Sequence, residues 1–338
     1  MVQMRPLLAV LLLSFPLLAL AQRKPGNPLE NLPKNIEVLT HFGERADISP
    51  DNQRVAFMAK SFGDAFVIDL KTRVIRCLTC NVPGAAFLRV MHLATGDYML
   101  IGPERFKDIR TSRGADNELW FLSKQAGSQP VRLGQRMSEG MAISKKSLKI
   151  AYSETSAQNP QLPPGASRLL VADLDPSARK IVNQTVVHES PDNRCTLEAQ
   201  DFYDNDTKMT FSCYEPKDMA SVMTIDLRTR QVVNQSKAPG MYNEPEGVFP
   251  DGLHTLVEAD RQVKQLGGRP GSGNIDIWKL RLDGTGKDFT RLTNFNDYEG
   301  GKASNPVVST DGRFMAFQSA RATDEAGVGY GLLLYRFR

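Results

Sequence analysis

The densest group of chemically useful side chains lies in residues 243–260, with the sequence NEPEGVFPDGLHTLVEAD. It contains three glutamates, two aspartates and one histidine. Paired carboxylates beside a base could perform general acid–base chemistry, and carboxylate oxygens are suitable ligands for a hard cation. Asp and Gly are also the residues from which tight turns are built, so the segment is equally well interpreted as the boundary of a repeat. Recurrence of the pattern along the chain distinguishes the two interpretations.

The pattern does recur. FPDGLHTLV at residues 249–257 aligns with STDGRFMAF at 309–317 and SPDNQRVAF at 49–57. Each copy has a turn of Asp with Gly or Asn, followed by alternating apolar residues, which predicts a hairpin turn and a half-buried strand. Weaker copies with the same spacing occupy residues 93–101, 144–152 and 203–211.

Further β-rich runs follow each copy, so every unit is expected to hold four strands. Units of this length, each built from four strands, are typical of β-propellers. The sixth unit lacks its last strand, and IEVLT at residues 36–40 supplies a matching one that would cover an exposed sheet edge. The sequence therefore predicts an all-β, six-bladed β-propeller over residues 36–338, closed by its N-terminal strand joining the last blade.

Two segments carry a family resemblance. NIDIWKLRLDGTGKDFTRLTNF at residues 274–295 and VSTDGRFMAFQSA at residues 308–320 resemble the TolB-like propeller repeat, a WD-like repeat. The resemblance extends over residues 36–337. It implies a propeller fold and an exported, periplasmic protein, here without the α/β domain that precedes the propeller in TolB.

The N-terminus has the features of a secretory signal peptide over residues 1–21. Arg5 precedes an apolar run, and Ala19-Leu20-Ala21 offers a small-x-small cleavage site. Residues 22–35 are expected to form a flexible leader, and no later segment is apolar enough for a transmembrane anchor. We therefore expect an exported protein, periplasmic or secreted. The net charge of +4 falls to +3 without Arg5, which excludes a strongly basic nucleic-acid-binding surface.

The loops between the second and third strands of each unit are long and polar, and functional residues gather on such loops more often than on tight turns. Counting back five positions from each turn identifies glutamates in four units, with Leu88 and Ser304 in the other two. We expect these glutamates, with the neighbouring Glu246, to surround the mouth of the central channel; they are Glu44, Glu139, Glu198 and Glu244. Such a ring would bind a cation or basic ligand, or else accept backbone hydrogen bonds from neighbouring blades.

Two of the long loops are basic. Their candidate residues for contacting an anionic partner are Arg105, Arg110, Arg113, Arg261, Lys264 and Arg269. The alternative is that these side chains only keep the loops soluble.

Most catalytic signatures are missing from the sequence. It contains no Gly-x-Ser-x-Gly motif, and its four histidines lack the spacing of a zinc site. His254 follows a turn and is interpreted as structural. Pairs within the carboxylate ring leave one enzymatic alternative, a polysaccharide lyase or hydrolase.

The four cysteines suggest two local pairs. Cys195 and Cys213 flank a hairpin whose turn is placed near residues 204–205, so they are expected to face each other and form a disulfide. Cys77 and Cys80 form C-x-x-C at the end of a strand, where a disulfide or two free thiols are both open.

These inferences predict a monomeric, exported TolB-like propeller that acts as a non-catalytic binding or scaffold protein. Its partner is expected to be a protein or peptide at the long-loop face and channel mouth. We expect no cofactor, although a divalent cation at the channel mouth is compatible with the ring, and the sequence leaves the metal open.

Overall fold

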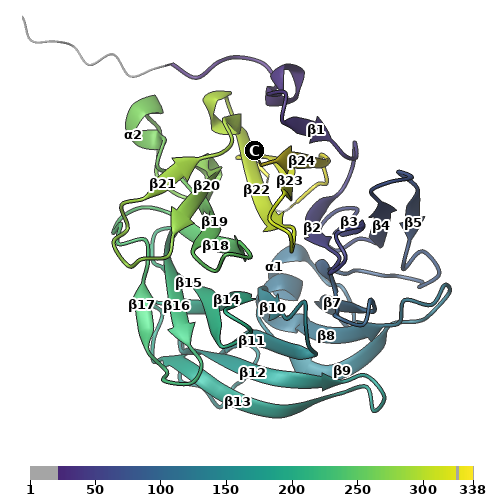
Figure 1. The fold of residues 1–338 in the computed structure, drawn as a ribbon. Coiled ribbons are helices and arrows are strands. Elements are labelled where there is room, and N and C mark those ends of the chain that lie inside the picture. The colour runs from purple at the N-terminus through teal and green to yellow at the C-terminus, as the bar shows by residue number, and fades with distance from the viewer. Residues whose placement is uncertain (1–21, 325–326, 338) are drawn as a thin grey trace, which may run out of the picture.

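Six sheets of four antiparallel strands form a ring in the computed structural model, which describes residues 22–324 and 327–337 (Figure 1). The first strands of successive sheets contact one another and so surround the central axis. The predicted six-bladed, all-β propeller is thus confirmed. The predicted signal peptide, residues 1–21, lies outside the described residues.

The first three blades follow one another along the chain, each with its strands hydrogen-bonded in sequence order. Blade 1 contains β2 (Glu44–Ile48), β3 (Arg54–Met58), β4 (Ala65–Asp69) and β5 (Ile75–Cys77). Blade 2 contains β6 (Arg89–His92), β7 (Tyr98–Pro103), β8 (Asn117–Leu122) and β9 (Val131–Arg136). Blade 3 contains β10 (Met141–Ile143), β11 (Lys149–Thr155), β12 (Ser167–Asp175) and β13 (Lys180–Ser190).

The last three blades repeat this order until the ring closes. Blade 4 contains β14 (Thr196–Tyr203), β15 (Lys208–Glu215), β16 (Met219–Asp226) and β17 (Val232–Asn234). Blade 5 contains β18 (Asn243–Val248), β19 (His254–Ala259), β20 (Asp276–Arg281) and β21 (Phe289–Arg291). Blade 6 contains β22 (Gly301–Val308), β23 (Phe314–Arg321) and β24 (Leu332–Arg336), with β1 (Ile36–Val38) as its outer strand.

Strand β1 closes the ring as predicted. It pairs antiparallel with β24, with Ile36 opposite Tyr335 and Val38 opposite Leu333. The two ends of the propeller are therefore joined within one sheet. This pairing covers the edge that β24 would otherwise expose.

The second strand of each blade is buried more completely than predicted. Along β3, Val55, Ala56, Phe57 and Met58 are all fully buried, although alternation had indicated a half-buried strand. Neighbouring blades cover both faces of each sheet, so the inner strands lose their exposed face. The outer strand β9, by contrast, keeps a fully alternating pattern of exposure.

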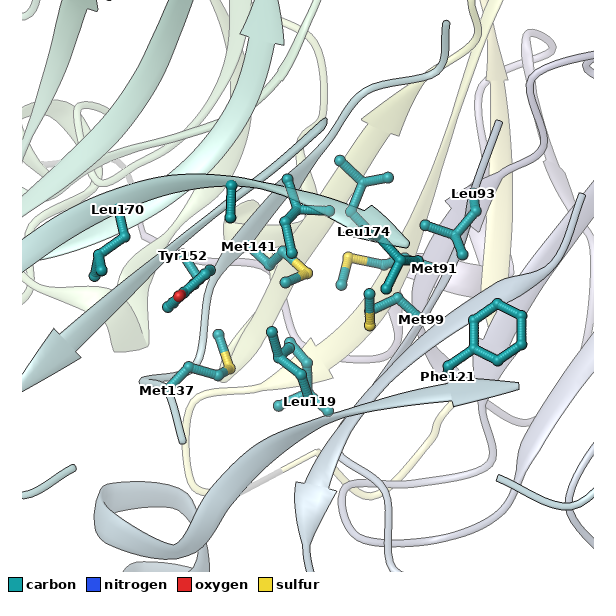
Figure 2. Packing of buried hydrophobic residues seen from close by; sticks show 14 residues of the cluster. Met91, Leu93, Met99, Leu119, Phe121, Met137, Met141, Tyr152, Leu170 and Leu174 are labelled. Carbon is teal, nitrogen blue, oxygen red and sulfur yellow. The ribbon is translucent and has the colours of Figure 1, made fainter. Parts of the chain in front are cut away.

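Apolar side chains between adjacent blades hold the ring together. The largest cluster joins β6, β7 and β8 of blade 2 to β10, β11 and β12 of blade 3 (Figure 2). Four of its members are methionines, which fill irregular gaps because their side chains are unbranched and flexible. They are Met91, Met99, Met137 and Met141.

Residues 22–35, predicted to be a leader, lie against blades 5 and 6. A short 3-10 helix, η1 (Pro28–Asn31), is capped by the side chain of Asn27. Arg23 donates hydrogen bonds to the backbone and side chain of Asn296 at 3.0 Å, and Lys24 bridges to Tyr298. Among the described residues, no helix has the length and apolar character needed to cross a membrane.

Both cysteine pairs form disulfides, Cys195 with Cys213 and Cys77 with Cys80. The predicted register of the first pair is wrong by two residues, because Cys213 lies opposite Leu197. The hairpin turn is one residue further along than predicted, which moves the residue opposite Cys213 away from Cys195, and a β-bulge between Ala199 and Asp201 moves it back by one. The disulfide therefore joins diagonal rather than facing positions.

Candidate functional site

The long loops lie at one end of the central channel, as expected from the order of the strands. The loop between β7 and β8 contains α1 (Ile109–Thr111) and the single π-helical turn η2 (Ser112–Asp116). The loop between β19 and β20 contains α2 (Val263–Leu266) and the 3-10 turn η3 (Ser272–Asn274). The corresponding loop of blade 6 runs from β23 to β24. The tight turns between first and second strands lie at the other end.

Two cavities occupy the channel. The cavity at the long-loop end has a volume of about 430 Å³, and the predicted glutamates that line it are Glu44, Glu139, Glu198 and Glu244. The cavity at the tight-turn end, of about 280 Å³, is lined by Glu246. Both are also lined by Arg45, Arg89 and Asn305, so these three residues lie where the cavities adjoin.

A β-bulge recurs on the innermost strand of four blades. The pairing shifts between Glu44 and Asp47 in blade 1, and bulges occupy the corresponding place in blades 4, 5 and 6. Bulges turn side chains away from the regular alternation of a strand. The bulge residues here line the channel cavities; they are Arg45, Gln200, Glu246 and Asn305.

Glu139 is held by two arginines. Arg113 donates to both carboxylate oxygens, through Nε to Oε2 and through Nη2 to Oε1 at 2.7 Å. Nη2 of the buried Arg45 donates to Oε1, also at 2.7 Å. Burial alone would raise the pKa of Glu139, but the charges of Arg113, Arg45 and Arg89 hold it well below its usual range. Glu139 is therefore a neutralised, structural carboxylate.

Glu44 is only partly compensated. Ser61 donates to its Oε1 atom at 2.6 Å, and Arg45 Nε lies 3.7 Å from the same oxygen. Oε2 is buried and has no hydrogen-bond partner within the described ranges. This oxygen packs against Gly327 of the β23–β24 loop and has no protein donor.

Glu198 has no ion pair in the described part of the chain. Its polar contact is with Gln200, whose Nε2 lies 3.3 Å from Oε1. Burial and the charges of Glu139 and Glu244 raise the pKa of Glu198 to about 8. A cation placed in the cavity would therefore lower this pKa and favour the ionised form.

Three carboxylates meet in blade 5. Glu244 lies directly opposite Glu258 on β19, and one oxygen from each, with one from Glu246, lie within 4.8 Å of one another. Tyr214 and Tyr242 each donate a hydroxyl hydrogen bond to Glu244, and the backbone N–H of Asn305 donates to Glu258. Three carboxylates in this arrangement could hold a cation or share protons.

The basic loop residues do not act together. Arg113 alone among them lines the long-loop cavity, through its bond to Glu139. Arg261 stacks on Phe289, with its guanidinium carbon 3.7 Å from the ring centroid. The others are exposed on their loops and do not line that cavity; they are Arg105, Arg110, Lys264 and Arg269.

The tight-turn end contains a second charged group. Asp47 accepts hydrogen bonds from the backbone N–H and ring Nδ1 of His92, at 2.7 and 2.9 Å, and Lys145 donates to it at 2.7 Å. Asp47 thereby ties blades 1, 2 and 3 together.

Asp201 of blade 4 lines the same cavity, and burial raises its pKa to about 7 although Val248 donates a backbone hydrogen bond to it. His254 bonds the turn residue Asp251 at 2.9 Å.

Sequence reasoning missed several residues around the long-loop cavity. Arg45 and Arg89 each directly follow the position that the count from the turn selected in blades 1 and 2. Extending that count by one position would have identified both arginines. Glu258, Tyr214 and Tyr242 lie elsewhere in their blades, and their positions carry no repeat signal. Only pairing across strands and blades brings them to the channel.

The fold has many relatives among solved structures. A protein assigned as TolB from Agrobacterium tumefaciens superposes with a TM-score of 0.53 and 14% identity, over 76% of this chain and 78% of that one. The chain has the propeller fold of TolB. A TolB-type propeller is thus confirmed at the level of fold, which is all that such identity supports.

Other matches span a range of proteins. TolB from Acinetobacter baumannii aligns with a TM-score of 0.47 and 17% identity, over 81% of this chain but 61% of that one. A chain of the mitotic checkpoint complex reaches 0.51 at 11% identity, over 97% and 99% of the two chains. Two lyases also match, with TM-scores below 0.5 that carry no argument. No family model and no curated protein sequence matches this TolB-type propeller.

Proposed function

We propose that this TolB-type propeller is an exported, non-catalytic binding protein whose long-loop face docks a protein or peptide partner. The partner inserts a basic side chain into the channel mouth. The observation that carries this proposal is the excess of carboxylates over basic side chains around the channel. We define the carboxylate ring as Glu44, Glu139, Glu198, Glu244, Glu246 and Glu258, and the basic side chains that act on it are Arg45, Arg89, Arg113 and Lys302.

Within the ring, Glu198 is the best acceptor for a partner's cation. It lines the long-loop cavity and lacks an ion pair among the described residues, whereas Glu139 is bound by two arginines. A lysine or arginine side chain reaching Glu198 would gain a charge-assisted hydrogen bond away from bulk water. Glu44 lines the same cavity and would add negative charge beside it.

Exposed apolar side chains lie on the same face. Val328 and Tyr330 line the cavity from the loop between β23 and β24, and Ser61 of the next blade donates a backbone hydrogen bond to Gly327 of that loop. Phe106 lies on the β7–β8 loop and packs on Phe62 beside Ser61. Aromatic side chains are enriched at protein interfaces, so exposed apolar groups beside the cavity favour a protein partner. These exposed side chains are Phe42, Phe106, Val328 and Tyr330.

The enzymatic alternative has one observation in its favour. Glu139 and Glu198 have pKa values displaced in opposite directions, which is the pattern of an acid–base pair in a lyase or hydrolase. However, Arg113 and Arg45 occupy the oxygens of Glu139, so this carboxylate is poorly placed to accept a proton. We therefore favour binding, and cleavage of glycans or peptides by the purified protein would reverse that preference.

Selection of phage-displayed random peptides on the purified protein tests the proposal. We expect enriched peptides to carry lysine or arginine next to an aromatic or aliphatic residue. Their affinity should fall about tenfold or more in Glu198→Gln, as expected for loss of a buried charge pair. Glu104→Gln, at an exposed position of the β7–β8 loop, is the matched control and should bind normally. Enrichment without basic residues, or unchanged binding to Glu198→Gln, would overturn the proposal.

A further inference from the structure

The three carboxylates of blade 5 form no ion pair within the described residues, as is also true of Glu198, and they differ from Glu198 in lying together as a group. Glu44 and Glu139 both approach arginines, but none of the ion pairs among residues 22–324 and 327–337 involves Glu244, Glu246 or Glu258. All three are more than nine-tenths buried. Carboxylates placed opposite each other on adjacent strands repel, and burial strengthens that repulsion. The blade therefore carries an electrostatic cost that its own side chains leave uncompensated.

One oxygen of this group has no partner. Oε1 of Glu246 is buried and forms no hydrogen bond within the described residues, and Glu246 is only 7% exposed. Donors satisfy the neighbouring carboxylates instead, because both tyrosine hydroxyls go to Glu244 and the Asn305 N–H goes to Glu258. These bonds fix the orientation of two carboxylates and leave the third open. Ligands of bound metals are commonly held in this way by hydrogen bonds from behind.

We propose that Glu244, Glu246 and Glu258 bind one hard divalent cation, such as Ca²⁺ or Mg²⁺, at the inner edge of blade 5. Three carboxylates supply oxygen ligands of the kind these ions select. One ligand oxygen from each already lies within 4.8 Å of the other two, which a cation could draw together with small side-chain movements. The β-bulge between Pro245 and Val248 places Glu246 beside the Glu244–Glu258 pair.

The competing explanation is that protons, rather than a metal, relieve the repulsion. Burial and the charges of its neighbours raise the pKa of Glu246 well above its usual range, and similar causes raise that of Glu258 to about 7. Both explanations neutralise the same oxygens, so a cation would displace protons from the group. Direct measurement of cation binding separates them.

The cation site goes beyond the proposed partner site and uses different residues. A divalent ion in blade 5 would compensate part of the negative charge of the carboxylate ring, and Glu198 would remain for a basic side chain. Peptide selection reports on Glu198, whereas cation binding is measured on the isolated protein. Failure of one proposal therefore leaves the other intact.

Terbium luminescence provides the first test. Tb³⁺ replaces Ca²⁺ at oxygen sites, and Tyr214 and Tyr242 lie next to Glu244, where they can sensitise its emission. We expect saturable emission from the chelator-treated protein that Ca²⁺ or Mg²⁺ displaces. The melting temperature should rise by about 2 °C for each tenfold increase in free cation above the dissociation constant, compared with NaCl at equal ionic strength.

Variants locate the site. Glu246→Gln should lose both the emission and the cation-dependent rise, while its stability in chelator equals or exceeds that of wild type, because a buried charge has been removed. Glu104→Gln, at an exposed position of the β7–β8 loop outside the channel group, should keep both signals. No saturable emission from the wild type, or equal cation responses in wild type and Glu246→Gln, would overturn the proposal. If Glu246→Gln does not fold, Glu258→Gln and the wild-type titration still decide it.

Discussion

Gly140 lies against Glu198 so closely that a Cβ atom at residue 140 would come within 3.0 Å of the Glu198 Cγ atom. Glycine therefore makes room for the only ring glutamate of blade 4. Gly140→Ala should displace the carboxylate from its place in the cavity.

We expect Gly140→Ala to weaken binding of the selected basic peptides about as much as Glu198→Gln does. The free energy of unfolding should change by only about 1–2 kcal/mol, since the displaced atoms belong to a movable side chain. Peptide titrations and urea unfolding measure the two effects. Gly114→Ala is the control, because a Cβ atom there would meet nothing within 4 Å. Normal peptide binding by Gly140→Ala would contradict the role of this contact.

Removal of Arg113 should destabilise the propeller at neutral pH. Arg113→Ala leaves Glu139 with Arg45 as its one hydrogen-bonding guanidinium, and we expect a loss of about 1–3 kcal/mol, reduced by the partial exposure of Arg113. Because the folded-state pKa of Glu139 is lowered, its stabilising contribution is fully present above the unfolded pKa of about 4.3 and is lost as pH falls from there towards the lowered folded-state pKa. The difference between wild type and variant should therefore be largest near neutral pH and shrink once pH falls below the folded-state pKa that Glu139 has in the variant.

Urea unfolding in steps from pH 7 down to about pH 2.5 measures this dependence. Arg110→Ala, on the same loop but exposed, should have little effect across the range. An Arg113→Ala effect that stays constant over the whole range would argue against the ion pair as its cause.

Asp201 should give stability the opposite pH dependence. Its pKa rises to about 7 on folding, so ionisation costs stability as pH increases from about 4 to 7. Asp201→Asn removes that cost, and we expect the variant to gain on the order of 1–3 kcal/mol relative to wild type between pH 4 and pH 8. Asp201 is partly exposed, so solvent screening reduces the full effect.

Thermal or urea unfolding across this pH range provides the measurement. Asp288→Asn changes an exposed aspartate of blade 5 and should leave the wild-type slope unaltered. A wild-type slope retained in Asp201→Asn would show that Asp201 does not titrate in this range.

The two disulfides should contribute unequally to stability. Cys195 and Cys213 are 18 residues apart, and chain-entropy arguments give a contribution of about 3 kcal/mol for such a loop. Cys77 and Cys80 are separated by three residues, and the same argument gives about 2 kcal/mol. Urea unfolding of the two Cys→Ser double variants compares them. A larger loss from the Cys77–Cys80 pair would contradict the loop-length explanation.

The local pattern of the sequence was sufficient to predict the blades. Turns such as Ser49-Pro50-Asp51 and Ser309-Thr310-Asp311 recur because only a few residue types accept their backbone angles, and the following alternation specifies a strand. The matching strand at residues 36–40 even indicated how the ring closes. The glutamates at a constant distance from the turns could also be placed near the channel. In a repeat fold, equivalent positions of successive blades lie at the same level along the channel axis.

Only the tertiary structure shows which of those glutamates have an arginine partner and which do not. Counting cannot reveal that Arg113 crosses from its loop to bind Glu139, or that Glu258 faces Glu244 from the next strand, because these contacts depend on strand register and loop path. The β-bulges have no sequence signal of their own here, yet they turn Glu246 into the channel and change which residue lies opposite Cys213. Local sequence patterns determine the secondary structure. The pairing of charges in the channel depends instead on distances between side chains of different blades, and these distances are fixed by how the blades pack together.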